Sequence, residues 1–177
     1  RNGRIFQSGS RSQVFANDLK TGKLLWTYEP LADSPPSSFL EIWLSSINRG
    51  VALYEDLVIV ATADCRLVAI DQATGVVRWE TETCDNKQAY MITGAPRVGG
   101  GKVFIGNSCA DMGLNRGHVD AVDARTGKYL WRFYTVPGDP NQPQDSELYE
   151  MAAKTWGESW YEKTKGCGSV WDAMVYD

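Results

Sequence analysis

The sequence predicts an all-β fold made of repeated units, and three observations support this prediction. One eleven-residue motif occurs three times in the 177 residues, beginning at Ala16, Ala69 and Ala121, which are 53 and 52 residues apart. Each copy ends on a tryptophan, and each has turn residues between two short apolar stretches. Repeats of about 50 residues are typical of propellers and solenoids, in which one unit cannot bury its apolar face alone.

Each copy of the motif has the features of a hairpin. In the second copy Asp71 follows a short strand and suits an Asx-type turn, and Thr74 and Gly75 supply a residue that tolerates a positive φ. The next strand ends on Trp79. A small alanine and a large tryptophan at fixed spacing predict an indole ring packed on the neighbouring unit, which is a structural role.

The third repeat differs from the other two in one hairpin. The first strand and the motif alanine are 11 residues apart in the first two repeats, from Ile5 and from Val58, and 18 apart in the third, from Val103. The seven extra residues fall within 107–117. A repeat that departs from its period at one loop is a common place for function, although a plain surface loop is the alternative. The repeats are predicted around 1–50, 51–101 and 102–177.

Composition and charge limit the possible functions. The net charge is −4 and 43% of the residues are hydrophobic, as in ordinary globular proteins. The chain lacks an apolar run of about 18 residues and a basic stripe, so neither a membrane span nor a nucleic-acid partner is predicted. Both ends interrupt a strand pattern, which indicates a segment of a longer protein. The missing signal sequence therefore says nothing about compartment.

Cysteine and histidine usage offers little chemistry by itself. Cys65, Cys84, Cys109 and Cys167 form no C-x-x-C pair, and two disulfides among them could be connected in three ways. His118, the single histidine, lies on an apparent strand and is predicted to be packed or at an edge. Farther along, the pattern predicts a short helix over 146–155 and a strand start over 173–176.

Several stretches together resemble one family, the quinoprotein alcohol dehydrogenases. They are the three motifs and the segments 48–52, 93–98, 133–140, 154–156 and 168–171. The resemblance implies an eight-bladed β-propeller of which this chain supplies roughly three blades, with the rest of its own propeller as a partner. It also implies a periplasmic enzyme that oxidises a small alcohol with pyrroloquinoline quinone and a calcium or lanthanide ion, and that passes electrons to a cytochrome c. The family's aspartate base would lie beyond Asp177.

The resemblance also assigns site residues. Arg49 would polarise the quinone oxygens, Trp171 would form the floor under the flat ring, and Asp111 stands where the family has a metal-binding glutamate. The complete set of candidate cofactor contacts is Arg49, Thr93, Ser108, Cys109, Ala110, Ser169, Trp171 and Trp43.

Three departures from the family pattern concern the same site. Trp43 and Leu44 replace two adjacent cysteines that roof the quinone in the family, so Trp43 would either stack on the ring or fill its space. Asp111 is one methylene shorter than glutamate, which would weaken a calcium site that needs about six to eight oxygens. Cys109 replaces a glycine. The alternatives are therefore a non-catalytic propeller scaffold that has lost the quinone site and, less well supported, a protein-binding propeller of another family.

Overall fold

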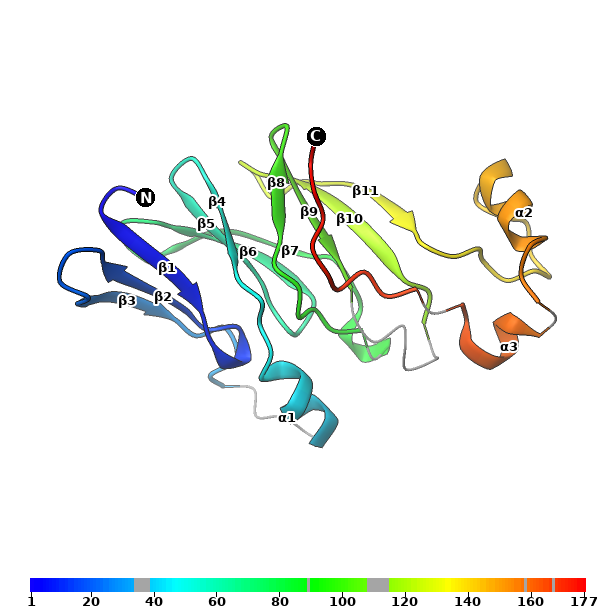
Figure 1. Cartoon of the computed structure of the whole chain (residues 1–177), viewed down its shortest axis with the longest axis horizontal. Helices are drawn as coiled ribbons and strands as arrows, with labels where there is room; N and C mark the ends of the chain where they lie inside the picture. The colour runs from blue at the N-terminus through cyan, green and yellow to red at the C-terminus, as the bar shows by residue number, and fades with distance from the viewer. Residues whose placement is uncertain (34–38, 89, 108–114, 158, 167) are drawn as a thin grey trace.

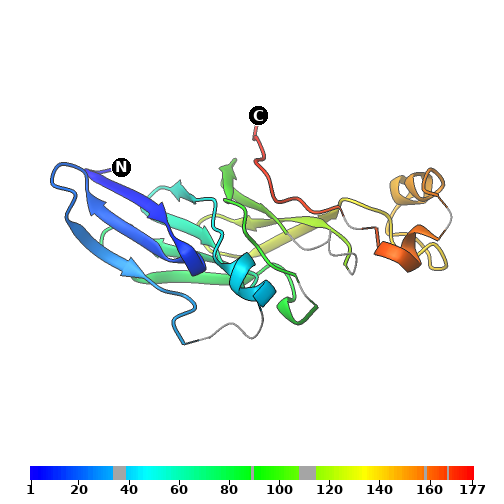
Figure 2. The same cartoon turned by 60° about the horizontal axis from the view of Figure 1, so that its bottom comes forward.

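The computed structural model describes residues 1–33, 39–88, 90–107, 115–157, 159–166 and 168–177. Its described strands form three antiparallel sheets, which lie side by side in Figures 1 and 2. The first sheet has the order β1-β2-β3, with β1 Arg4–Ser8, β2 Val14–Asp18 and β3 Leu24–Tyr28. The second has the order β4-β5-β6-β7, with β4 Val51–Tyr54, β5 Leu57–Ala61, β6 Arg66–Asp71 and β7 Val77–Glu82. The third has the order β8-β9-β10-β11, with β8 Arg97–Gly99, β9 Lys102–Gly106, β10 His118–Asp123 and β11 Tyr129–Tyr134.

Short helices occupy the connections. They are η1 Ser10–Ser12, α1 Phe39–Ser45, η2 Asn86–Gln88, α2 Glu147–Ala153 and α3 Trp160–Thr164. The all-β prediction is confirmed, and α2 lies within the helix predicted over 146–155. β8 belongs to the third sheet although its residues fall in the range 51–101, because the repeated motif marks the outer hairpin of each sheet and not its first strand.

The core lies between neighbouring sheets. Every residue of β5 is buried, because its alternate side chains face opposite neighbours. Leu57 and Ile59 pack with Ile105 of the third sheet, whereas Val58 and Val60 pack in the cluster that reaches the first sheet. The continuous apolar run of this strand is therefore the signature of a sheet covered on both faces.

The repeated tryptophans link one sheet to the next. Trp26 packs on Gly75, where an added Cβ would lie 2.9 Å from the indole, and its Nε1 donates to the carbonyl of Gln72 at 3.1 Å. Trp79 packs on Gly127 in the same way, at 2.7 Å. Both glycines have φ near +75°, so they serve the turn and the contact together. The predicted packing of the indole on the neighbouring unit is confirmed for these two copies.

The turn of each motif is held by one aspartate. Oδ1 of Asp71 accepts hydrogen bonds from the Thr74 amide and hydroxyl, each at 2.9 Å, as the sequence predicts. These bonds lower the pKa of Asp71 below its usual value, because they favour the charged carboxylate. Asp18 and Asp123 make the same bonds, and their pKa values are lowered for the same reason.

The prediction of a strand over 173–176 is wrong, because residues 172–177 have no strand assignment. The segment instead bonds and packs through side chains. Nε of Arg97 donates to the carbonyl of Met174 at 3.1 Å, and the Tyr176 ring lies against Gly99 and Gly100, where an added Cβ would collide with it.

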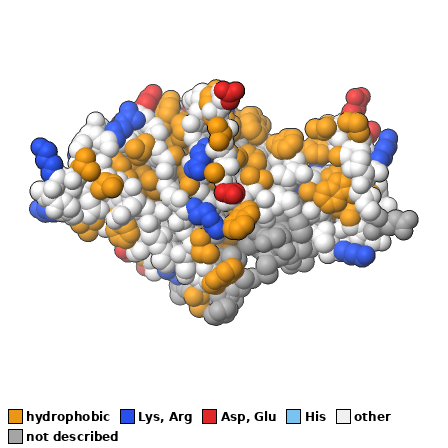
Figure 3. Space-filling model, viewed as in Figure 1, with side chains coloured by type: hydrophobic (Ala, Val, Ile, Leu, Met, Phe, Trp, Pro, Cys, Tyr) orange, Lys and Arg blue, Asp and Glu red, His pale blue; other side chains and the backbone are white. Residues whose placement is uncertain are grey.

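The surface carries apolar side chains beyond the sheets. Figure 3 shows hydrophobic side chains along the sheets and over the region of α2 and α3. In that region Leu148 and Met151 are 53% and 62% exposed. Among the described residues, no helix has the length and apolar character needed to cross a membrane.

Candidate functional site

The segments before β4 and β8, the end of β9 and the segment 168–171 lie at one end of the sheets. The opposite end carries the three Asp–Thr–Gly turns. Figure 1 shows α1 at the first end and both termini of the chain at the other. Three residues assigned to the cofactor by resemblance, Arg49, Thr93 and Trp171, come together at the first end from separate connections.

Arg49 is placed by the Asn-Arg-Gly sequence around it. Nδ2 of Asn48 donates to the carbonyl of Ala61 at 2.9 Å, which ties the segment to the end of β5. Oδ1 of Asn48 accepts the Gly50 amide at 3.1 Å, and Gly50 has a φ of +132°, a conformation that favours glycine. Asn48 and Gly50 thus set the backbone on both sides of Arg49.

Arg49 and Thr93 are bonded through main chain and side chain. The Arg49 amide donates to the Thr93 carbonyl at 3.1 Å. Nη1 of Arg49 also donates to Oγ1 of Thr93 at 2.5 Å and to its carbonyl at 3.3 Å. Thr93 is buried, so these bonds fix the position of the Arg49 guanidinium relative to the Thr93 segment.

Trp171 lies under the Arg49 guanidinium. The Cζ atom of Arg49 is 4.7 Å from the centre of the indole ring, which is a cation–π contact. Trp171 is 53% exposed, so much of its ring remains open to solvent. An added Cβ on Gly94 would lie 3.2 Å from the Trp171 carbonyl, which shows how closely the Thr93 segment approaches.

The segment 168–171 is held between Gly106 at the end of β9 and Gly117 just before β10. An added Cβ would lie 2.1 Å from the Val170 carbonyl oxygen at Gly106 and 2.0 Å from the Gly168 carbonyl oxygen at Gly117. Oγ1 of Thr135 donates to the Gly168 carbonyl at 2.6 Å, and the Val170 amide donates to the Asn107 carbonyl at 3.0 Å. Ser169 lies in this held segment and is partly buried.

Of the remaining assigned residues, Trp43 is the one that the structure describes. Ser108, Cys109, Ala110 and Asp111 lie outside the described residues. Trp43 is on α1 with 57% of its surface exposed. In the part of the chain that the structure describes, no three histidine, cysteine, aspartate or glutamate side chains come together as metal ligands.

A buried polar cluster lies beside this site. His118 and Asp120 are each 1% exposed, and Nδ1 of His118 is 2.8 Å from Oδ2 of Asp120, although the angle is not that of a hydrogen bond. Nε of Arg132 and the Tyr129 hydroxyl donate to Oδ1 of Asp120 at 2.9 and 2.6 Å. Burial raises the pKa of Tyr129 to about 12, and the bond to Asp120 adds to this. The prediction that His118 is a packed residue is confirmed.

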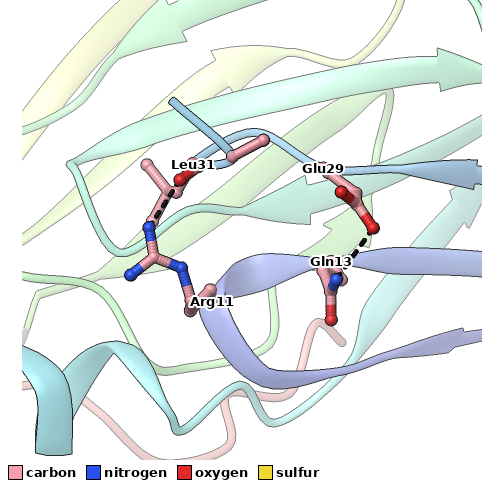
Figure 4. Close-up of a pocket in the computed structure, with 5 residues that line it drawn as sticks. Arg11, Gln13, Glu29 and Leu31 are labelled. Atoms are coloured by element: carbon pink, nitrogen blue, oxygen red, sulfur yellow. Dashed lines mark hydrogen bonds between the residues drawn. The ribbon is translucent and has the colours of Figure 1, made fainter. Parts of the chain in front are cut away.

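A disulfide and a pocket lie elsewhere. Cys65 and Cys84 are bonded, with their Cα atoms 5.0 Å apart, and join the β5–β6 turn to the chain after β7. The pocket in Figure 4 is lined by Arg11, Gln13, Glu29, Leu31 and Ala32, and its three polar side chains already bond to one another or to backbone. It shares no residue with the Arg49–Trp171 group.

Sequence reasoning missed the residues that position Trp171. They are Gly106, Asn107 and Gly117, which fell within or beside the unusual loop but were given no separate role. For one of them, Asn107, a comparison of the repeats provides a signal in the sequence. Asn107 follows Val103 by four residues, as Thr62 follows Val58, and both place a side-chain oxygen at the end of an equivalent strand.

The fold and this group of residues define the chain as a segment of a β-propeller with a candidate ring-binding site at one end. The model of the family described as glucose/ethanol/alcohol dehydrogenase, β-propeller domain, matches residues 1–177. The chain belongs to this pyrroloquinoline quinone (PQQ) family.

Named relatives agree with this assignment. Lupanine 17-hydroxylase [cytochrome c] from Pseudomonas sp is 49% identical over 99% of this chain and 25% of its own length. Quinohemoprotein alcohol dehydrogenase ADH-IIG from Pseudomonas putida is 46% identical over 99% and 24%. The chain therefore spans about a quarter of the length of these relatives.

Solved structures show the same fold. Quinohemoprotein alcohol dehydrogenase from Comamonas testosteroni has a TM-score of 0.85 and 41% identity, and the match covers 99% of this chain and 26% of that one. A europium-containing methanol dehydrogenase has a TM-score of 0.77 and 27% identity, covering 99% and 32%. The chain is therefore a fragment of a quinoprotein propeller, as the sequence predicts, and the scaffold alternative is not favoured.

Proposed function

We propose that this chain is part of a periplasmic quinoprotein dehydrogenase that oxidises a small alcohol with PQQ and a bound calcium or lanthanide ion. The observation that supports it best is the convergence of Arg49, Thr93 and Trp171. These residues are far apart in the sequence, yet the guanidinium lies 4.7 Å from the indole centre and bonds to Thr93.

The residues present fit a flat, anionic ring. The Trp171 ring already contacts a planar cationic group and remains 53% exposed, and an exposed indole suits stacking of an aromatic ring. Arg49 supplies N–H donors that remain charged at any working pH, and Thr93 supplies a hydroxyl beside them. PQQ, when bound, supplies a carbonyl group that accepts hydride from an alcohol.

Each residue then has a separate task. Trp171 sets the plane in which the ring lies. Arg49 directs positive charge at a carbonyl oxygen where negative charge develops, which is the usual basis of electrostatic stabilisation. Thr93 holds Arg49 in this direction from a buried position. The aspartate that takes the alcohol proton is proposed to lie beyond Asp177.

The metal and the remaining cofactor contacts are proposed from the family pattern. Asp111 would supply a carboxylate oxygen to the metal, and Ser108, Cys109 and Ala110 would lie near a cofactor carboxylate. Ser169, in the segment held by Gly106 and Gly117, would contact the cofactor beside Trp171. A calcium or lanthanide ion suits an oxygen ligand of this kind.

Trp43 is proposed as the second face of the ring site. Its side chain is 57% exposed, so it is not packed into the interior of the described structure. An exposed indole on α1 supports stacking on a bound ring over permanent filling of the cofactor space. It would replace the roof that two adjacent cysteines form in the family.

Electron transfer to a cytochrome c in the periplasm is part of the same proposal. Its support is the naming of relatives as quinohemoproteins and of one as a hydroxylase with cytochrome c. Such an acceptor would carry away the electrons that the quinone takes from the alcohol.

The test is a titration of the full-length protein with PQQ, with calcium and separately with lanthanum, followed by tryptophan fluorescence and then alcohol-dependent dye reduction. Saturable quenching that requires a metal, together with turnover, is expected. Asp111→Ala should abolish the metal dependence, whereas Glu147→Ala, on exposed α2, should leave it unchanged. A folded protein that binds no quinone with either metal would overturn the proposal and restore the scaffold alternative.

A further inference from the structure

The second and third repeats close corresponding hairpins with the same kind of hydrogen bond. In the second repeat the Arg66 amide donates to Oγ1 of Thr62 at 3.2 Å. In the third, the His118 amide donates to Oδ1 of Asn107 at 2.8 Å. Arg66 and His118 each precede the motif alanine by three residues, so the two bonds are equivalent.

The number of residues enclosed by these bonds differs between the two repeats. Thr62 and Arg66 enclose residues 63–65, whereas Asn107 and His118 enclose residues 108–117. Closing a longer loop costs more conformational entropy, and the bond that closes it compensates for part of this cost. Thr62 and Asn107 are 0% and 1% exposed, so neither bond competes with bulk water.

The two residues use their carbonyl groups differently. The Thr62 carbonyl accepts the Cys65 amide at 3.1 Å, within its own turn. The Asn107 carbonyl accepts the Val170 amide at 3.0 Å, from the segment that carries Trp171. A side-chain bond that fixes the Asn107 backbone therefore also fixes an acceptor for this distant segment.

We propose that Asn107 is a positioning residue for the quinone site. Its side chain closes the enlarged hairpin, and its carbonyl sets the position of Val170 and hence of the Trp171 ring beneath Arg49. This inference rests on the proposed function for its effect on quinone binding. Its effect on the segment 168–171 is measurable without any cofactor.

The first test compares Asn107→Ala with Thr62→Ala in the full-length protein. Both variants lose the equivalent buried bond, and Thr62→Ala also loses the bonds that its hydroxyl donates to Asp64 and to the Arg66 carbonyl, so both should unfold at lower urea concentration. Titration with PQQ in the presence of lanthanum should give a Kd about tenfold higher for Asn107→Ala and within about twofold of wild type for Thr62→Ala. Equal effects of the two variants on Kd would overturn the proposal.

The second test is amide hydrogen exchange of a peptide covering 168–171, without quinone. Exchange should be at least about tenfold faster in Asn107→Ala than in wild type and unchanged in Thr62→Ala. Unchanged exchange in Asn107→Ala would overturn the proposal, and so would faster exchange with an unchanged quinone Kd. A wild-type protein that binds no quinone would overturn the proposed function, and exchange alone would then decide whether Asn107 holds the segment.

A third variant keeps the test informative if Asn107→Ala does not fold. Asn107→Thr copies the residue of the second repeat and offers a shorter acceptor. We expect a rise in Kd of about threefold and partly faster exchange at 168–171. Wild-type values in both assays would contradict the requirement for the longer side chain.

Discussion

The β5–β6 turn and the β9–β10 loop occupy equivalent places in neighbouring sheets but have been put to different uses. The turn over 63–65 is bound by the Cys65–Cys84 disulfide, and the Thr62 carbonyl that precedes it accepts the Cys65 amide of the same turn. Asn107, which precedes the longer loop, accepts the Val170 amide with its carbonyl, and Gly106 and Gly117 hold the segment of Trp171 between them. The difference teaches that a propeller repeat can change one hairpin without changing its strand register, because a side-chain acceptor closes both hairpins.

The largest effect on the candidate site is expected from Gly106→Ala. The new Cβ would lie 2.1 Å from the Val170 carbonyl oxygen, which is main chain and cannot turn away. We expect a loss of about 3 kcal/mol in stability, as for severe overpacking, and a quinone Kd at least about a hundredfold higher. Gly157→Ala is the control, since nothing lies within 4 Å of an added Cβ there. Quinone titration and urea unfolding measure both effects, and near-wild-type binding by Gly106→Ala would contradict the packing described.

A second prediction concerns the turn. Replacing Cys65 and Cys84 by alanine should cost about 2 to 4 kcal/mol in unfolding free energy, because the disulfide closes a loop between residues 19 apart. The quinone Kd should stay within about twofold of wild type, because the Thr62 carbonyl is bonded within its own turn. Urea unfolding and quinone titration of the double variant test this. A tenfold rise in Kd would show that the turn also supports the site.

The smallest effect is expected where the repeats are alike, in the Asp–Thr–Gly turns. The folded-state pKa values of Asp18, Asp71 and Asp123 are lowered, so their stabilising contribution is present above the unfolded value near 3.8 and is lost as pH falls through the lower folded values. The urea concentration at the midpoint of unfolding should therefore decrease once the pH is lowered below about 4. Replacing Thr21, Thr74 and Thr126 by valine should make this fall shallower, and an unchanged pH profile would contradict it.

The features predicted correctly from the sequence are those that depend on local chemistry. The turn at Asp71 needs only the residues next to it, and the packing of Trp79 on Gly127 follows from repetition of one motif. Both are therefore visible in sequence. The convergence of Arg49, Thr93 and Trp171 was expected through family resemblance, and the structure brings these three together while their binding role stays a prediction.

Other features depend on distant parts of the chain. Four cysteines allow three pairings, and only the approach of the β5–β6 turn to the end of β7 selects Cys65 with Cys84. Asn107 looked like an ordinary loop residue because its partner Val170 is far away in sequence. The strand predicted over 173–176 failed because an apolar pattern does not supply a hydrogen-bonding neighbour.

The separation of the two ends of the sheets has an evolutionary consequence. The Asp–Thr–Gly turns and the tryptophans that rest on them lie at one end, so substitutions there are constrained by packing and by the hydrogen bonds of the turns. The connectors at the other end can change in length and composition without disturbing those contacts. A lineage built on this arrangement can therefore alter the residues of the candidate site while its ancestral scaffold remains nearly constant.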